Sequence, residues 1–143
     1  MIRSVAVVLL VCIFFGCSSS MQRTYPSVER SHLWTAMIAS ADSPEYSSED
    51  FRKRWIVLEN EVELNPRQGQ IDVKRIIHRS LQLPRQRAQR DRKDVSFSVY
   101  LLPTNPPTIE FISHNSMYIP VHSLNESERY FDAVEALLVP VVD

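Results

Sequence analysis

The sequence predicts an α+β fold, in which an N-terminal helix, a four- or five-stranded antiparallel sheet and a C-terminal helix follow one another. Apolar residues recur at helical spacing near both ends of the chain and at every second position between them. A short turn joins the first two alternating segments, which favours a hairpin and therefore antiparallel strands. We expect both helices to pack on one face of the sheet.

The first ordered element is predicted to be a helix that begins near Pro26, with Ser27 as its N-cap. Its apolar side chains recur with helical spacing at Leu33, Trp34, Met37, Ile38 and Ala41. The helix should end at Asp42-Ser43-Pro44, and a polar loop should follow over Glu45–Asp50.

The segment that follows alternates as a half-buried strand does. Its predicted inner face carries Ile56, Leu58, Val62 and Leu64, interrupted by Asn60, and its outer face carries Glu59, Glu61 and Glu63. Pro66 and Gly69 then mark a turn. We expect the glutamates to face water, as the polar side of a solvated sheet.

Residues 71–83 allow two interpretations. Strand spacing groups Ile71, Val73, Ile77, Leu81 and Leu83 on one face, interrupted by Arg75 and Arg79. Helical spacing groups Val73, Ile76, Ile77 and Leu81 instead. The strand is preferred because a short turn after a strand favours a hairpin, in which basic and acidic strands would face each other.

The rest of the chain completes the sheet and adds the final helix. Residues 84–93 have no apolar period and are predicted to form a loop. Residues 95–102 and 108–113 are predicted strands, joined by a rigid proline-rich connection, and 117–122 is a predicted short extended piece. Ser123 and Glu126 form a capping box at the start of the last helix. Its apolar stripe is Tyr130, Phe131, Val134, Leu137 and Leu138, and Pro140 should stop it.

The N-terminal residues look like an export signal. Arg3 precedes an apolar run over residues 5–15, which is shorter than the roughly 20 residues that span a bilayer, and small polar residues follow. Phe14-Phe15-Gly16-Cys17 resembles a bacterial lipobox, although leucine or valine is usual at the position of Phe14. This resemblance implies cleavage before Cys17 and attachment of lipid to its thiol. The expected organisation is a signal peptide over 1–16, a lipidated tether over 17–26 and one domain over 27–143.

The resemblance to lipoproteins also implies a location. The mature chain would be anchored in the bacterial cell envelope, and we expect the periplasmic side of the outer membrane rather than the inner membrane. The order of elements over residues 27–139 resembles that of small α+β domains in envelope lipoproteins such as BamC, a member of the β-barrel assembly machinery. The likeness is one of element order and not of shared motifs.

Charge and composition narrow the function further. The chain has 16 basic and 17 acidic residues, so it is no polycation, and we expect no nucleic-acid partner in the envelope. Gly69 is its only glycine beyond the signal segment, which excludes glycine-rich loops that hold phosphates. The candidate contact surface for anionic head groups or an acidic envelope protein is a run of five cations: Arg85, Arg87, Arg90, Arg92 and Lys93. A purely solvating role for these charges is the alternative.

No motif for catalysis or metal binding is present. The four histidines have no His-x-x-x-His spacing, and no Gly-x-Ser-x-Gly elbow occurs. We therefore expect a non-catalytic binding or scaffolding domain without metal or cofactor. Two alternatives stay open: a hydrolase that uses His114 or His122 with a carboxylate, and a small-ligand carrier with a pocket between sheet and helices.

Overall fold

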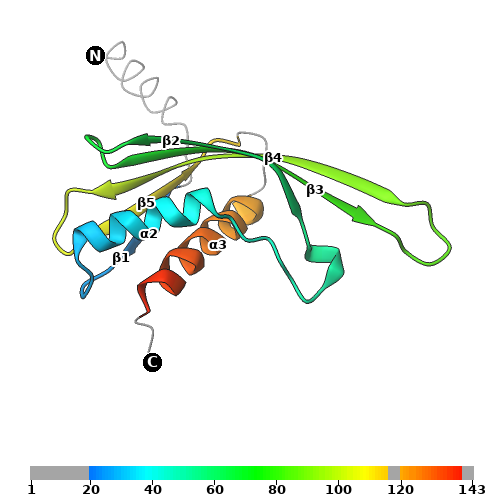
Figure 1. Cartoon of the computed structure of the whole chain (residues 1–143), viewed down its shortest axis with the longest axis horizontal. Helices are drawn as coiled ribbons and strands as arrows, with labels where there is room; N and C mark the ends of the chain where they lie inside the picture. Colours follow the sequence, from blue (N-terminus) through cyan, green and yellow to red (C-terminus); the bar gives the residue numbers. More distant parts are fainter. Residues whose placement is uncertain (1–19, 116–119, 140–143) are drawn as a thin grey trace, which may run out of the picture.

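The computed structural model describes residues 20–115 and 120–139, with only the backbone described over 120–125, and it has the predicted α+β architecture (Figure 1). Its elements in chain order are β1 (Ser20–Thr24), α2 (Arg30–Asp42), the 3-10 helix η2 (Phe51–Lys53), β2 (Ile56–Asn65), β3 (Gln70–Leu81), β4 (Gln89–Leu102), β5 (Thr108–Ser113) and α3 (Pro120–Leu138). The strands form one antiparallel sheet in the order β1-β5-β4-β3-β2. Both helices cover the same face of this sheet (Figure 1), as predicted.

The core lies between the helices and the inner face of the sheet. Phe97 of β4 stacks on Phe111 of β5 with 4.6 Å between ring centroids, and Tyr130 and Phe131 of α3 pack against this pair. Leu33, the first buried apolar residue of α2, is fully enclosed in the same core. The predicted helical faces are therefore buried over most of their length.

Both helix starts differ from the prediction. Helix α2 begins at Arg30 after Glu29, so Ser27 is not its N-cap. Helix α3 begins at Pro120, so the backbone from 120 to 122 is helical rather than extended, and Ser123 lies inside the helix. The rest of the predicted extended piece, 117–119, lies outside the described residues. Proline suits a first helical turn because its missing N–H would have no intrahelical partner there.

The predicted tether is wrong over its second half. Ser20–Thr24 forms the edge strand β1, which pairs with β5 from Ser20 opposite Ile112 to Thr24 opposite Thr108. The segment is short and polar, so it shows no clear apolar period. The sheet edge therefore begins three residues after Cys17.

A bulge changes which side of β2 is buried. The register with β3 shifts between Val57 and Glu59, so the extra residue, Leu58, reverses the alternation. Ile56 is 60% exposed and Leu58 is 53% exposed, which contradicts the prediction that they belong to the core. Leu64, near the open end of this edge strand, is also exposed. Glu59, Glu61 and Glu63 face water as expected.

Strand β3 confirms the strand interpretation of residues 71–83, although it ends at Leu81 and leaves the half-buried Leu83 outside it. The predicted loop over 84–93 is wrong from Gln89 onward, because β4 begins there and pairs with the end of β3. Residues 79–91 form a two-stranded projection that none of the other described strands flanks; we call it the arm. Figure 1 shows it extending well beyond the helices.

Candidate functional site

A groove of about 790 Å³ lies between the base of the arm, the segment that precedes β2 and helix α3. Ile77, Val95 and Phe97 form its apolar floor, and each of them is almost fully buried. Tyr46 and Trp55 contribute aromatic rings from the segment before β2. The charged side chains at its walls are Lys53, Arg79, Asp91, Arg92, Lys93, Asp94, Glu126, Glu128, Arg129 and Asp132.

Trp55 connects the segment before β2 to the base of the arm through contacts with two cations. The guanidinium of Arg79 lies 4.6 Å from the centre of the Trp55 ring, and the ammonium of Lys93 lies 5.5 Å from it. Arg79 also pairs with Asp91 directly across the hairpin at 2.8 Å, and donates to the backbone carbonyl of Arg52 at 2.5 Å. These contacts give one wall of the groove a fixed shape.

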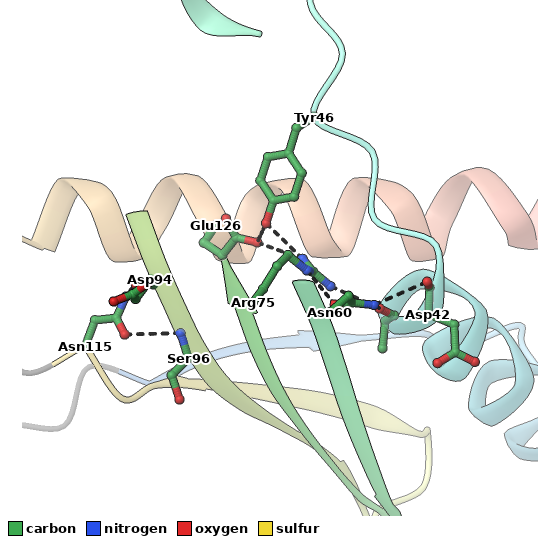
Figure 2. A network of polar contacts seen from close by, with 9 residues as sticks. Asp42, Tyr46, Asn60, Arg75, Asp94, Ser96, Asn115 and Glu126 are labelled. Atoms are coloured by element: carbon green, nitrogen blue, oxygen red, sulfur yellow. Dashed lines mark hydrogen bonds and ion pairs between the residues drawn. The ribbon is translucent and has the colours of Figure 1, made fainter. Parts of the chain in front are cut away.

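A buried cation lies where the sheet, both helices and the segment before β2 meet (Figure 2). Arg75 of β3 is 4% exposed and donates three hydrogen bonds: to Asn60 Oδ1 at 2.8 Å, to the Tyr46 hydroxyl at 2.8 Å and to the Ala41 carbonyl at 3.0 Å. Its guanidinium also lies 3.5 Å from a carboxylate oxygen of Glu126. These partners satisfy the buried charge, which would otherwise be very costly.

Tyr46 joins this cation to α3. Its hydroxyl accepts from Arg75 and donates to Glu126 at 2.6 Å. Burial, together with the adjacent Glu126 carboxylate, raises the pKa of the Tyr46 phenol well above its usual range despite the opposing effect of Arg75. The phenol therefore stays protonated and remains a donor to Glu126.

Asn115 continues the hydrogen-bond ladder of β4 past the end of β5. Its side-chain oxygen accepts from the Ser96 amide at 3.1 Å, and its side-chain nitrogen donates to the Asp94 carbonyl at 3.0 Å (Figure 2). An asparagine side chain here takes the place of one further β5 residue. It closes the end of the groove nearest to β5.

Most acidic side chains of the groove already have a cationic partner. Glu126 pairs with Arg75, Asp91 with Arg79, Asp94 with Arg92 at 3.7 Å, and Asp132 with Arg23 at 3.8 Å. Three cations, Lys53, Lys93 and Arg129, form no ion pair with any residue that the structure describes. Glu128 is the one carboxylate of the groove that likewise forms no ion pair with a described residue. The walls carry five cations and five carboxylates, so the positive charge without an ion-pair partner is local, at Lys53, Lys93 and Arg129.

The structure divides the five predicted contact cations between two places. Arg85, Arg87 and Arg90 are exposed at the arm and form no ion pair within residues 20–115 and 120–139. Arg92 is exposed and pairs with Asp94, whereas Lys93 turns toward Trp55 in the groove. The groove residues Lys53 and Trp55 were not predicted. The sequence does contain a signal for them, because Trp55 follows three consecutive basic residues.

The candidate hydrolase residues are not arranged as a catalytic triad. Ser98 Oγ donates to Asp72 and contacts His114 Nε2 at 2.5 Å, so the ring nitrogen of His114 must be the donor in that second contact. A nucleophilic serine instead gives its proton to histidine, and a carboxylate holds the other ring nitrogen. Ser98 is also 2% exposed. The side chain of His122 lies outside the described part of the chain, as does Cys17.

Two further features are absent from the residues that the structure describes. No group of three or more histidine, cysteine, aspartate or glutamate side chains is placed to hold a metal ion. No helix within the same residues is long and apolar enough to cross a membrane.

Comparison with known proteins gives a likeness to solved structures and nothing further. No family model and no curated protein matches the chain. The crystal structure of a protein from Chromobacterium violaceum aligns with a TM-score of 0.42 at 11% identity, covering 85% of this chain and 97% of that one. An uncharacterized protein from Rhizobium leguminosarum aligns with a TM-score of 0.38 at 10% identity, covering 85% and 93%.

Proposed function

We propose that this chain is a lipid-anchored protein of the bacterial cell envelope, and that its domain is a non-catalytic binding module which the arm orients on an anionic membrane surface. The anchor is lipid on Cys17, as the lipobox-like residues before it imply. The observation that carries the proposal is that Ser20, the first residue of β1, lies at the end of that strand nearer to the arm.

The strand register supports this placement. Ser20, the first residue of β1, lies in one row with Ile112, Ser98 and Asp72 across the sheet. Strand β3 continues past that row toward the arm, whereas β1 runs away from the arm from Ser20 to Thr24. Cys17 lies at most about 11 Å from Ser20, because a residue spans no more than about 3.6 Å. The domain is therefore held close to its lipid.

The charges of the arm fit an anionic surface. Ser80, which pairs with Arg90, lies eight residues beyond Asp72 along β3, so the arm reaches about 26 Å past the row of Ser20. Arg85 and Arg87 lie in the turn beyond that pair. Each basic residue near an anionic bilayer contributes about 1 kcal/mol. That is enough to orient a domain that its lipid already holds at high local concentration.

The test is the distance between the arm and the bilayer. The full lipidated chain is reconstituted in phosphatidylcholine vesicles, with or without phosphatidylglycerol, that carry an acceptor dye on a head group. A donor dye is attached to Ala88→Cys in the turn of the arm or, as a matched control, to Thr104→Cys in the exposed connection at the opposite end of the sheet. We expect stronger energy transfer from position 88, and only when phosphatidylglycerol is present.

The charge requirement is tested in the same vesicles. Replacing Arg85, Arg87 and Arg90 by glutamine should reduce energy transfer from position 88 to that seen without phosphatidylglycerol. About 1 M salt should do the same, because it shortens the screening length to about 3 Å. Equal transfer from positions 88 and 104, or transfer that survives both changes, would overturn the proposal.

A further inference from the structure

We infer that the groove beside the arm binds a small amphiphilic anion, with its oxyanion head group against Lys93 and Arg129 and its apolar part beside Trp55. The shared ligand chemistry is a phosphate, carboxylate or sulfonate attached to an apolar body. This site is separate from the turn of the arm and does not require lipidation of Cys17.

Lys93 and Arg129 favour an anion, because neither forms an ion pair with a residue that the structure describes. Lys93 and Arg129 come from opposite walls, β4 and α3, and each lies over an aromatic ring rather than beside a carboxylate. The Arg129 guanidinium is 4.4 Å from the centre of the Tyr46 ring. Cation–π contacts position these groups but leave their charge uncompensated, because a ring carries no net charge. Asp94, Glu128 and Asp132 line the same groove, but none of them forms an ion pair with Lys93 or Arg129.

The shape and lining of the groove select an amphiphile. A volume of about 790 Å³ lies in the usual range for small-molecule sites. Trp55 is half-buried and still offers apolar contact, whereas Tyr46 and the floor of Ile77, Val95 and Phe97 are almost fully buried. A bare inorganic anion would leave the exposed part of Trp55 in contact with water, whereas an apolar tail would cover it.

The experiment uses the full chain in phosphatidylcholine nanodiscs, which carry no net anionic lipid, with empty nanodiscs as the blank. Octyl phosphate is titrated by calorimetry below the concentration at which it forms micelles. Octyl glucoside has the same tail and a neutral head, so it tests the need for charge. We expect octyl phosphate to bind at least about tenfold more tightly than octyl glucoside, as one charge-assisted hydrogen bond would give.

Matched variants locate the site. Lys93→Gln and Arg129→Gln should each weaken octyl phosphate binding about tenfold or more. Lys74→Gln, an exposed lysine on the opposite face of the sheet, should leave it unchanged. Lys93→Arg should restore binding, which a merely structural loss would not allow. Thermal unfolding of each variant confirms that it is folded.

The inference fails if octyl glucoside binds as tightly as octyl phosphate, or if Lys93→Gln and Arg129→Gln bind octyl phosphate as the unaltered chain does. Glutamine at Arg85, Arg87 and Arg90 together should not alter octyl phosphate binding, because those side chains lie in the arm away from the groove. Loss of binding in that variant would also overturn the inference. The vesicle and nanodisc experiments can therefore fail independently.

Discussion

Asn60 and Arg75 face each other across β2 and β3, and both side chains donate to the carbonyl of Ala41 at the end of α2. They also bond to each other, at 2.8 Å from Arg75 Nε to Asn60 Oδ1. The last carbonyls of a helix have no intrahelical donors and carry a partial negative charge. The pair supplies those donors and a full positive charge, and thereby fixes the end of α2 against the sheet.

Removing the guanidinium should destabilise the whole domain. Arg75→Ala removes the guanidinium from the Ala41 carbonyl and from the Glu126 carboxylate, and loss of one partner from a buried ion pair costs about 3–5 kcal/mol. The free energy of unfolding, measured by urea denaturation, should fall by that amount.

The neighbouring Lys74→Ala is the control, because Lys74 is exposed on the other face of the same strand. It should cost no more than about 0.5 kcal/mol. If the losses at positions 74 and 75 were equal, the Arg75 network would not contribute to stability.

This pair also shows what the sequence could predict. Asn60 and Arg75 were visible as polar interruptions of two apolar strand faces, and the short turn at 66–69 places them opposite each other. Two interruptions in one cross-strand row predict a polar pair. Their partners Ala41 and Glu126 come from helices whose packing angle no local pattern encodes, so the rest of the network could not be predicted.

The incorrect predictions about the sheet have local physical causes. The β2 bulge reverses the alternation with one residue, and apolar periodicity carries no signal for an extra residue. The arm lies outside the core, so β4 over residues 89–93 needs no apolar face and is held by pairing with β3. Strand β1 is also short and mostly polar. It is the edge strand of the sheet, and backbone pairing with β5 holds it in place.

Alkaline pH should destabilise the domain through its buried phenols. Burial raises the pKa of Tyr25, Tyr46 and Tyr130 in the folded state, whereas an unfolded tyrosine titrates near about 10. The unfolded state therefore releases protons first, and stability should be constant below about pH 10 and fall above it, by up to about 1.4 kcal/mol per pH unit for each phenol.

Tyr46→Phe isolates one of these contributions. Chemical denaturation between pH 8 and about pH 11 should show a shallower alkaline decline than in the unaltered chain, since one titrating phenol is gone. The variant should also be less stable at neutral pH, because Arg75 and Glu126 lose their shared hydroxyl. An identical alkaline slope in both proteins would show that the Tyr46 phenol titrates normally.

Truncation to alanine should have different effects at Phe131 and at Leu137, which both lie on α3. Phe131 is 1% exposed and contacts Phe111 and Tyr130, so Phe131→Ala should cost about 3–5 kcal/mol. Leu137 is 50% exposed because Val134 and Leu138 take the buried side of this helical turn. Leu137→Ala should therefore cost less than about 1 kcal/mol by urea denaturation, and a larger loss would place it in the core after all.

Lipid attachment at Cys17 is the premise of the proposed function, and metabolic labelling checks it. Cells that express the unaltered chain should incorporate labelled palmitate into it, whereas Cys17→Ser should not be labelled, because a hydroxyl cannot form the thioether. Cys12→Ser is the matched control: Cys12 lies within the predicted signal peptide and would be removed by cleavage before Cys17, so its loss should not alter labelling. Equal labelling of the chain and the Cys17→Ser variant would remove the anchor. The arm would then have to bind an anionic surface without the high local concentration that an attached lipid provides, and three exposed arginines at about 1 kcal/mol each would give only weak binding.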